Sequence, residues 1–193
     1  FKLDDTKESI LETIHLVSHL SMSGGGIGVD LSALRDSDFG DEGKSSGPAA
    51  WGKVIDGTTC NISQNSRRSA VSTLYMSWYN LTINDFVMRA ALVDADHGRT
   101  YFTSKTAIWI SYLFLRRVYD NAEITLFDSK YAAKLDDLYG DEFNKAYTEL
   151  EKDETIPNQY RLKVNAYDLW MKIARYRSFS GTPFVLNFDA GSI

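Results

Sequence analysis

The sequence predicts an α/β protein, and three observations lead to this fold class. Apolar residues recur at helical spacing in several segments, first over 10–20 and most clearly over 159–177. Short runs such as 70–76 and 106–110 instead alternate apolar with polar residues or are apolar throughout, as strands are. Turn-forming stretches separate the two kinds of segment. Because helical and strand patterns alternate along the chain, we expect an α/β architecture.

The first elements are set by a capping pattern and by glycine. Asp5 is expected to cap the first helix, with Glu8 three residues later completing a capping box. Glycines at 24–26 end this helix, because glycine enters left-handed conformations at little steric cost. Residues 27–31 then form a short strand. Residues 36–48 lack any periodic apolar pattern, so we expect a mobile loop there.

The same criteria predict the remaining elements, and they reveal no internal repeat, low-complexity tract or linker. One single region, residues 1–193, is therefore the simplest organisation. The expected elements are a helix at 49–59, a loop at 64–69, a strand at 70–76, a helix after Thr82, a turn at 94–99, a strand at 106–110, a helix at 113–119, a strand at 124–127, a helix at 136–154 weakened at Gly140, a helix at 159–177 and a strand at 184–188.

Composition excludes several classes of protein. Hydrophobic residues make up 44% and charged residues 24%, as in ordinary soluble domains. The net charge of -5 gives no support for a surface that binds nucleic acid. No apolar run approaches the roughly 18 residues that span a membrane. The single cysteine, Cys60, excludes an internal disulfide and fits a reducing compartment, so we expect a cytoplasmic protein.

Several short segments carry a resemblance to a known family. Residues 23–30 read Ser-Gly-Gly-Gly-Ile-Gly-Val-Asp and lead to Leu34-Arg35, and residues 63–70 read Ser-Gln-Asn-Ser-Arg-Arg-Ser-Ala. The later matching pieces are Trp-Ile at 109–110, Leu-Phe-Leu-Arg-Arg-Val at 113–118, Ile-Thr-Leu-Phe-Asp at 124–128, Leu-Tyr-Gly-Asp-Glu-Phe at 138–143 and Gly-Thr-Pro-Phe at 181–184. In their order and spacing, these pieces resemble the large (catalytic) subunit of ribonucleotide reductase.

The resemblance implies a fold and an activity. The fold would be part of the family's ten-stranded α/β barrel, and the activity the radical-based reduction of ribonucleotides to deoxyribonucleotides. The family's radical cysteine lies in an Asn-x-Cys-x-Glu segment that this sequence lacks. The chain also begins at Phe1 rather than Met, and the family's chains are several times longer. We therefore expect an excerpt without catalytic residues, inactive by itself.

The first specificity loop of the family matches residues 35–48. There the matching arginine, Arg35, would contact the phosphates of a deoxynucleoside triphosphate effector, for which the paired donors of a guanidinium are suited. By the resemblance, the Asp5 carboxylate would accept a hydrogen bond from the effector's ribose hydroxyl. Asp4 is the alternative if the alignment shifts by one residue. From the residues alone, Arg35 would be a solvated arginine and Asp5 a helix cap.

The second specificity loop matches residues 63–69. In the family this loop lies between effector and substrate base, and it changes which base the active site prefers, as expected of a flexible element that both ligands bias. Its candidate residues here are Gln64, Arg67 and Arg68. The usual Gly-Gly after the glutamine is replaced by Asn65-Ser66, which puts the coupling in question. Alone, the two arginines read as solvent-facing charges.

The resemblance also implies partners. It implies a dNTP effector with Mg²⁺, a homodimer and, for the intact enzyme, a small radical-generating subunit. It does not determine the radical generator itself. The helices over 6–22 and 49–59 are the candidates for the dimer contact. Ile10, Ile14 and Trp51 would be interface residues or ordinary core. Because an incomplete barrel leaves open sheet edges, we expect self-association.

Two alternatives stay open, and one potential site is rejected. The chain could be a non-catalytic split or degenerate nucleotide-binding or interaction module, or an unrelated α/β nucleotide-binding protein. His15 and His19 lie four apart on the first helix and could reach one metal ion. No neighbouring ligands complete such a site, so no metal site is predicted.

Overall fold

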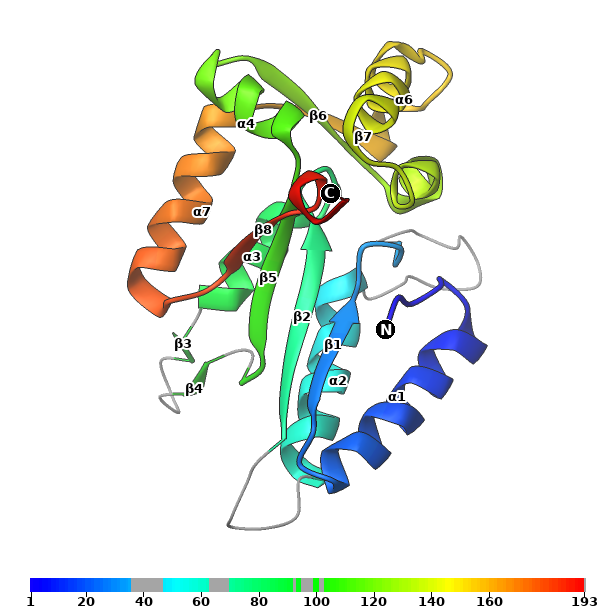
Figure 1. Ribbon diagram of the computed structural model, residues 1–193, viewed down its shortest axis with the longest axis vertical. Coiled ribbons are helices and arrows are strands. Elements are labelled where there is room, and N and C mark those ends of the chain that lie inside the picture. Colours follow the sequence, from blue (N-terminus) through cyan, green and yellow to red (C-terminus); the bar gives the residue numbers. More distant parts are fainter. Residues whose placement is uncertain (36–46, 63–69, 92, 95–98, 101–102, 193) are drawn as a thin grey trace.

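The sheet of the protein is parallel and carries the candidate site on one of its ends. The computed structural model describes residues 1–35, 47–62, 70–91, 93–94, 99–100 and 103–192. Within them, four parallel strands lie in the order β1-β2-β5-β8 (Figure 1). Their bounds are Gly26–Asp30 for β1, Val71–Ser77 for β2, Lys105–Ile110 for β5 and Phe184–Asn187 for β8. The predicted α/β class is confirmed.

Helices connect these strands, as parallel pairing requires. The first two helices pack against each other, and α3 and α4 both pack against α7. A short antiparallel ribbon that the sequence did not predict, β3 with β4, lies between α3 and β5. The bounds are Lys7–Met22 for α1, Gly47–Ile62 for α2, Ile83–Ala91 for α3, Val93–Asp94 for β3, Arg99–Thr100 for β4, Tyr112–Tyr119 for α4 and Ala166–Ser180 for α7.

A smaller unit is inserted between α4 and α7. Two antiparallel strands, β6 and β7, frame it, and Figure 1 shows them with α6 beyond the carboxyl ends of β1 and β2. This position brings the segment after β6 close to the start of the chain. The bounds are Glu123–Phe127 for β6, Ser129–Ala132 for α5, Ala133–Leu135 for the turn η2, Gly140–Lys152 for α6, Asn158–Tyr160 for η3 and Arg161–Asn165 for β7. Outside this unit, the turn η4, Asp189–Ser192, follows β8.

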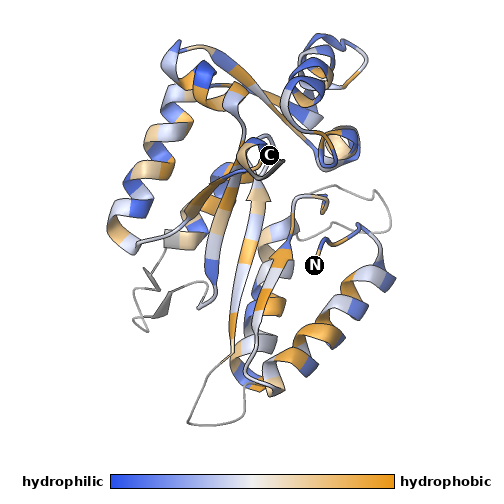
Figure 2. Ribbon diagram, viewed as in Figure 1, coloured by the Kyte–Doolittle hydropathy of each residue, from blue (hydrophilic) through white to orange (hydrophobic). Residues whose placement is uncertain are grey.

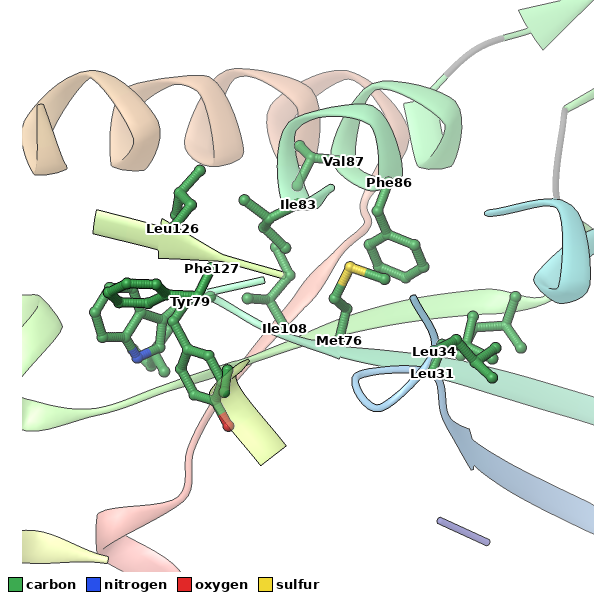
Figure 3. Close-up of a cluster of buried hydrophobic side chains, with 14 of the residues drawn as sticks. Leu31, Leu34, Met76, Tyr79, Ile83, Phe86, Val87, Ile108, Leu126 and Phe127 are labelled. Atoms are coloured by element: carbon green, nitrogen blue, oxygen red, sulfur yellow. The ribbon is translucent and has the colours of Figure 1, made fainter. Parts of the chain in front are cut away.

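The core joins the sheet to both groups of helices. Alternate residues of β2 point into it, and Leu74 and Met76 are fully buried. Figure 3 shows Met76 next to Phe86 of α3 and Ile108 beneath Ile83 of the same helix, and Figure 2 shows further hydrophobic residues along the strands and α1. Each such burial contributes roughly 1.5–3 kcal/mol. Beyond the strand ends, an aromatic cluster around buried Trp78 continues the core into the inserted unit; its members are Phe114, Phe143 and Tyr147.

The predicted cap of the first helix is wrong by one residue. Thr6, in an extended conformation, is the N-cap of α1, and its Oγ1 accepts a hydrogen bond from the backbone N–H of Ser9 at 3.2 Å. A threonine hydroxyl satisfies this free donor as an aspartate would. Asp5 is therefore left for another partner. The predicted glycine end is confirmed, since Gly24 follows the helix with φ of 67°.

Two predicted helices begin later than expected, and one loop is shorter. Residues 161–165 of the expected helix over 159–177 form β7, because the edge of β6 needs a partner strand. The helix expected from 136 starts at Gly140, whose φ of 54° does not fit a helix interior. Gly47 and Pro48 already belong to α2, so the expected loop over 36–48 is shorter at that end. Its residues 36–46 lie outside the described part of the chain.

Candidate functional site

The turn after β1 is held in place by a network of side chains. Asp30 ends the strand, and its Oδ1 accepts from the backbone N–H and the hydroxyl of Ser32 at 2.9 and 2.5 Å. Its Oδ2 accepts from Trp109 Nε1 of β5 at 3.1 Å, across the intervening strand β2. The Ser32 hydroxyl in turn accepts from the N–H of Ser77 at 2.8 Å. This network fixes the direction in which the chain runs on to Arg35.

Arg35 meets the segment before α1. Its Nε forms an ion pair with Oδ2 of Asp5, and both side chains are about one-quarter to one-third exposed. The pair bridges two segments 30 residues apart, next to a surface pocket of about 300 Å³. Such a volume lies at the lower end of the range for small-molecule sites. The pocket is lined by Asp4, Asp5, Ala33, Arg35, Ser129, Lys130 and Ala133.

The third wall of this pocket comes from α5, which the sequence interpretation did not connect with Arg35. Ser129 is 6% exposed, and its Oγ has no hydrogen-bond partner in the described part of the protein. Lys130 is exposed, with its ammonium 5.6 Å from the centroid of the Tyr131 ring and 5.9 Å from that of Tyr160. At these distances each ring attracts a cation. The residues were missed because no local pattern links α5 to β1.

A larger cavity, of about 460 Å³, opens at the carboxyl ends of the four parallel strands. Asp30, Ser77, Trp109 and Asn187 line it from β1, β2, β5 and β8. This end of a parallel α/β sheet is where ligands bind in such folds. None of these residues was predicted as catalytic.

Asp136 lies in the wall of the larger cavity. Its Oδ1 accepts from the hydroxyl of Tyr79 at 2.7 Å, and Lys2 Nζ lies 3.9 Å from its Oδ2. Burial raises the pKa of Asp136 above its usual value, although the hydrogen bond from Tyr79 and the charge of Lys2 oppose the shift. Burial, together with the nearby Asp136 charge, also raises the pKa of Tyr79 well above its usual value. Tyr79 is therefore a hydrogen-bond donor here, not a base.

The other candidate residues lie in different environments. Gln64, Arg67 and Arg68 lie outside the described residues. Ile10 is buried in the core, whereas Ile14 and Trp51 are half-buried against it. The imidazoles of His15 and His19 face each other with their Nε2 atoms 3.2 Å apart.

Two absences hold for the described ranges. These residues contain no group of three or more His, Cys, Asp or Glu able to hold a metal ion. No helix among them is long and apolar enough to cross a membrane.

Comparison with known proteins identifies the family. The model of the family described as "Ribonucleotide reductase, barrel domain" matches residues 1–191. The chain belongs to this family. It is 32% identical over 185 residues to the ribonucleoside-diphosphate reductase subunit alpha of Helicobacter pylori, covering 94% of this chain and 23% of the relative.

Eukaryotic and viral relatives give the same result. Large chain 2 of the Saccharomyces cerevisiae enzyme is 29% identical over 194 residues, which is 97% of this chain and 21% of the relative. The large subunit of Variola virus is 31% identical over 192 residues, again 97% of this chain and 24% of the relative. The chain thus spans about a quarter of the length of the relatives it matches. The four-stranded parallel sheet is part of the family's barrel domain, as the resemblance predicted.

Proposed function

We propose that this chain is the part of a ribonucleotide reductase large subunit that binds a dNTP effector and sets base specificity. The observation that carries the proposal is the contact between Asp5 and Arg35 beside a pocket of about 300 Å³. The family resemblance assigns these two residues to the ribose and the phosphates of one ligand. Two residues with roles toward one molecule must lie within its reach, and they do.

The chemistry of the pair suits such a ligand. A guanidinium presents its N–H donors in one fixed plane, which matches the oxygens of a phosphate. A carboxylate accepts hydrogen bonds, as a sugar hydroxyl requires. Mg²⁺ would enter with the triphosphate, whose oxygens are its usual ligands in nucleotide sites. The second loop, with Gln64, Arg67 and Arg68, would pass the identity of the effector base to the substrate site.

In the whole protein, we expect the larger cavity at the strand ends to face the substrate, because barrels of this class bind substrates there. The activity would be the reduction of ribonucleotides to deoxyribonucleotides, with catalytic cysteines supplied from outside this sequence. The relatives' designation as alpha or large subunits supports a small, radical-generating partner.

We expect the chain to form a homodimer through α1 and α2. Leu11, Leu16 and Leu20 of α1 are 64%, 37% and 38% exposed, and Val54 of α2 is 44% exposed. Exposed apolar side chains on these two helices favour association. Ile10 is already buried within one copy, so these exposed residues are better contact candidates.

The test is calorimetric titration of the chain with dTTP, dATP and dGTP in the presence of Mg²⁺. Arg35→Ala should weaken binding about 10- to 100-fold, since charged hydrogen bonds contribute roughly 1.5–3 kcal/mol. Arg116→Ala, which removes an exposed arginine of α4, is the matched control and should bind as the unchanged chain does. Sedimentation of the same samples reports whether the binding species is a dimer.

Asp5→Ala separates a ribose acceptor from a carboxylate that only neutralises Arg35. If Asp5 accepts from the sugar hydroxyl, the variant binds dNTP more weakly. If it only competes with phosphate for the guanidinium, the variant binds more tightly, and the ribose role is wrong. A folded dimer that binds no dNTP would instead favour the alternative, a non-catalytic split or degenerate module. The replacement of the usual Gly-Gly by Asn65-Ser66 in the second loop supports that alternative.

A further inference from the structure

The α5 wall of the Asp5–Arg35 pocket has no role in the resemblance, and its composition points to one. We propose that Ser129 and Lys130 form a second phosphate-binding element of this pocket, with Lys130 supplying charge and Ser129 a hydroxyl. The inference rests on the proposed effector site. It adds two residues about 95 positions away in sequence, which only the fold brings to Arg35.

The charge balance of the pocket depends on Lys130. Asp4 and Asp5 bring two negative charges, and Arg35 brings one positive charge. Without Lys130 the lining would carry a net charge of about -1, which opposes the entry of a polyphosphate. Lys130 brings the lining to neutrality, so a ligand with several negative charges no longer meets an excess of like charge.

The contacts of Lys130 also suit it to bind an anion. Its ammonium lies 5.6 and 5.9 Å from the ring centroids of Tyr131 and Tyr160, whose centroids are 5.4 Å apart. Within the described part of the chain no ion pair joins it to a carboxylate, and the ion pairs found there involve other cations. A cation held by weak aromatic contacts can bind an anion without first breaking a strong pair.

Ser129 supplies the second, independent observation. Its side chain is more than nine-tenths buried, lines the pocket, and leaves its Oγ without a hydrogen-bond partner among the described residues. Buried hydroxyls are normally paired, because leaving one unpaired costs about 1–3 kcal/mol. Such a group on the wall of a pocket is explained by a ligand oxygen that accepts from it.

The experiment compares Lys130→Ala and Ser129→Ala with the unchanged chain by titration with dTTP and dTMP in the presence of Mg²⁺. Lys130→Ala should weaken dTTP binding about 10-fold and dTMP binding less, because the charge acts on the phosphate chain. The matched control is Lys134→Ala, which removes an exposed lysine of η2 that does not line the pocket and should leave both affinities unchanged.

Ser129→Ala gives a readout that a purely structural role would not. It should weaken dTTP binding several-fold while leaving the melting temperature of the free chain unchanged or raised, since an unpaired buried hydroxyl is removed. A lowered melting temperature with unchanged affinity would overturn the role of Ser129.

The outcomes also separate this inference from the proposed function. If Arg35→Ala loses dTTP while Lys130→Ala and Ser129→Ala bind normally, the inference is overturned and the effector site stands. If Arg35→Ala binds dTTP as the unchanged chain does, or if the unchanged chain does not bind it, both are overturned.

Discussion

Asp56 is a buried acid that accepts several hydrogen bonds from residues far away in the sequence. It lies on α2, is 2% exposed, and accepts from the backbone N–H groups of Thr103 and Ser104 and from the Ser104 hydroxyl at 2.7–3.2 Å. Lys53 Nζ approaches its Oδ2 at 3.4 Å. The acid thereby ties α2 to the segment that enters β5. In the sequence, this role is indicated only by the position of Asp56, the one acidic residue on the buried face of the helix α2.

Asp56→Ala is expected to lower the free energy of unfolding by about 3 kcal/mol, because it leaves buried donors without an acceptor. Urea unfolding followed by circular dichroism measures the change. Asp85→Ala is the matched control: Asp85 pairs with Arg89 one helical turn away and is 39% exposed, so its loss should cost about 0.5 kcal/mol. If both variants lost the same free energy of unfolding, the hydrogen bonds of Asp56 would contribute no more than an exposed ion pair does.

At the scale of elements, the junction of β7 and α7 shows how pairing overrides a local pattern. The residues of β7 continue the helical spacing of α7, yet they form five paired positions with β6. Asn165 marks the boundary: its Oδ1 accepts from the N–H of Asp168 at 3.1 Å, and its Nδ2 donates to Asn121 Oδ1 at 3.0 Å. Asn165 is therefore an N-cap, and the helix starts after it.

Asn165→Ala tests this boundary, because the two alternatives predict opposite signs. As the loss of an N-cap, the change should lower the free energy of unfolding by about 1 kcal/mol. Were 159–177 one continuous helix, alanine would be the better helix former and the variant would be more stable. Lys145→Ala, at an exposed position within α6, should stay within about 0.5 kcal/mol and serves as control in the same thermal melts.

At the scale of the whole molecule, the inserted unit is linked to the sheet through Asp136. Tyr79, just beyond β2, donates to this carboxyl, and Lys2 from the start of the chain lies beside it. The raised pKa of Asp136, caused chiefly by burial, means that the folded protein holds a proton there more tightly than the unfolded chain. The contribution to stability is fully present below the ordinary pKa of 3.8 and is lost as the pH rises through the raised value.

Asp136→Asn should remove this pH dependence, since the amide stays neutral and can still accept from Tyr79. We expect the variant to gain stability relative to the unchanged chain as the pH rises from about 3.8 toward neutrality, measured by urea unfolding at a series of pH values. Asp137→Asn removes the neighbouring carboxylate, which is 82% exposed, and should have little effect. A stability difference that did not vary with pH would contradict the assignment.

The sequence by itself determined the fold class and the order of most elements. The periodicities of α1, β2 and β5 are strong because each element buries one face or both, and the family pieces keep their order along the chain. These properties depend on local spacing and on short segments, which a sequence displays directly.

Only the tertiary structure decided which distant groups meet. Lys130 and Ser129 reach the pocket, Asp56 reaches Ser104, and residues 161–165 become a strand, each through a partner far away in the chain. The same holds at the start of α1, where Thr6 caps the helix and Asp5 contacts Arg35. Polar and charged groups pair with whichever partner the packed chain brings within about 3 Å. The local sequence does not show which distant residue will come that close.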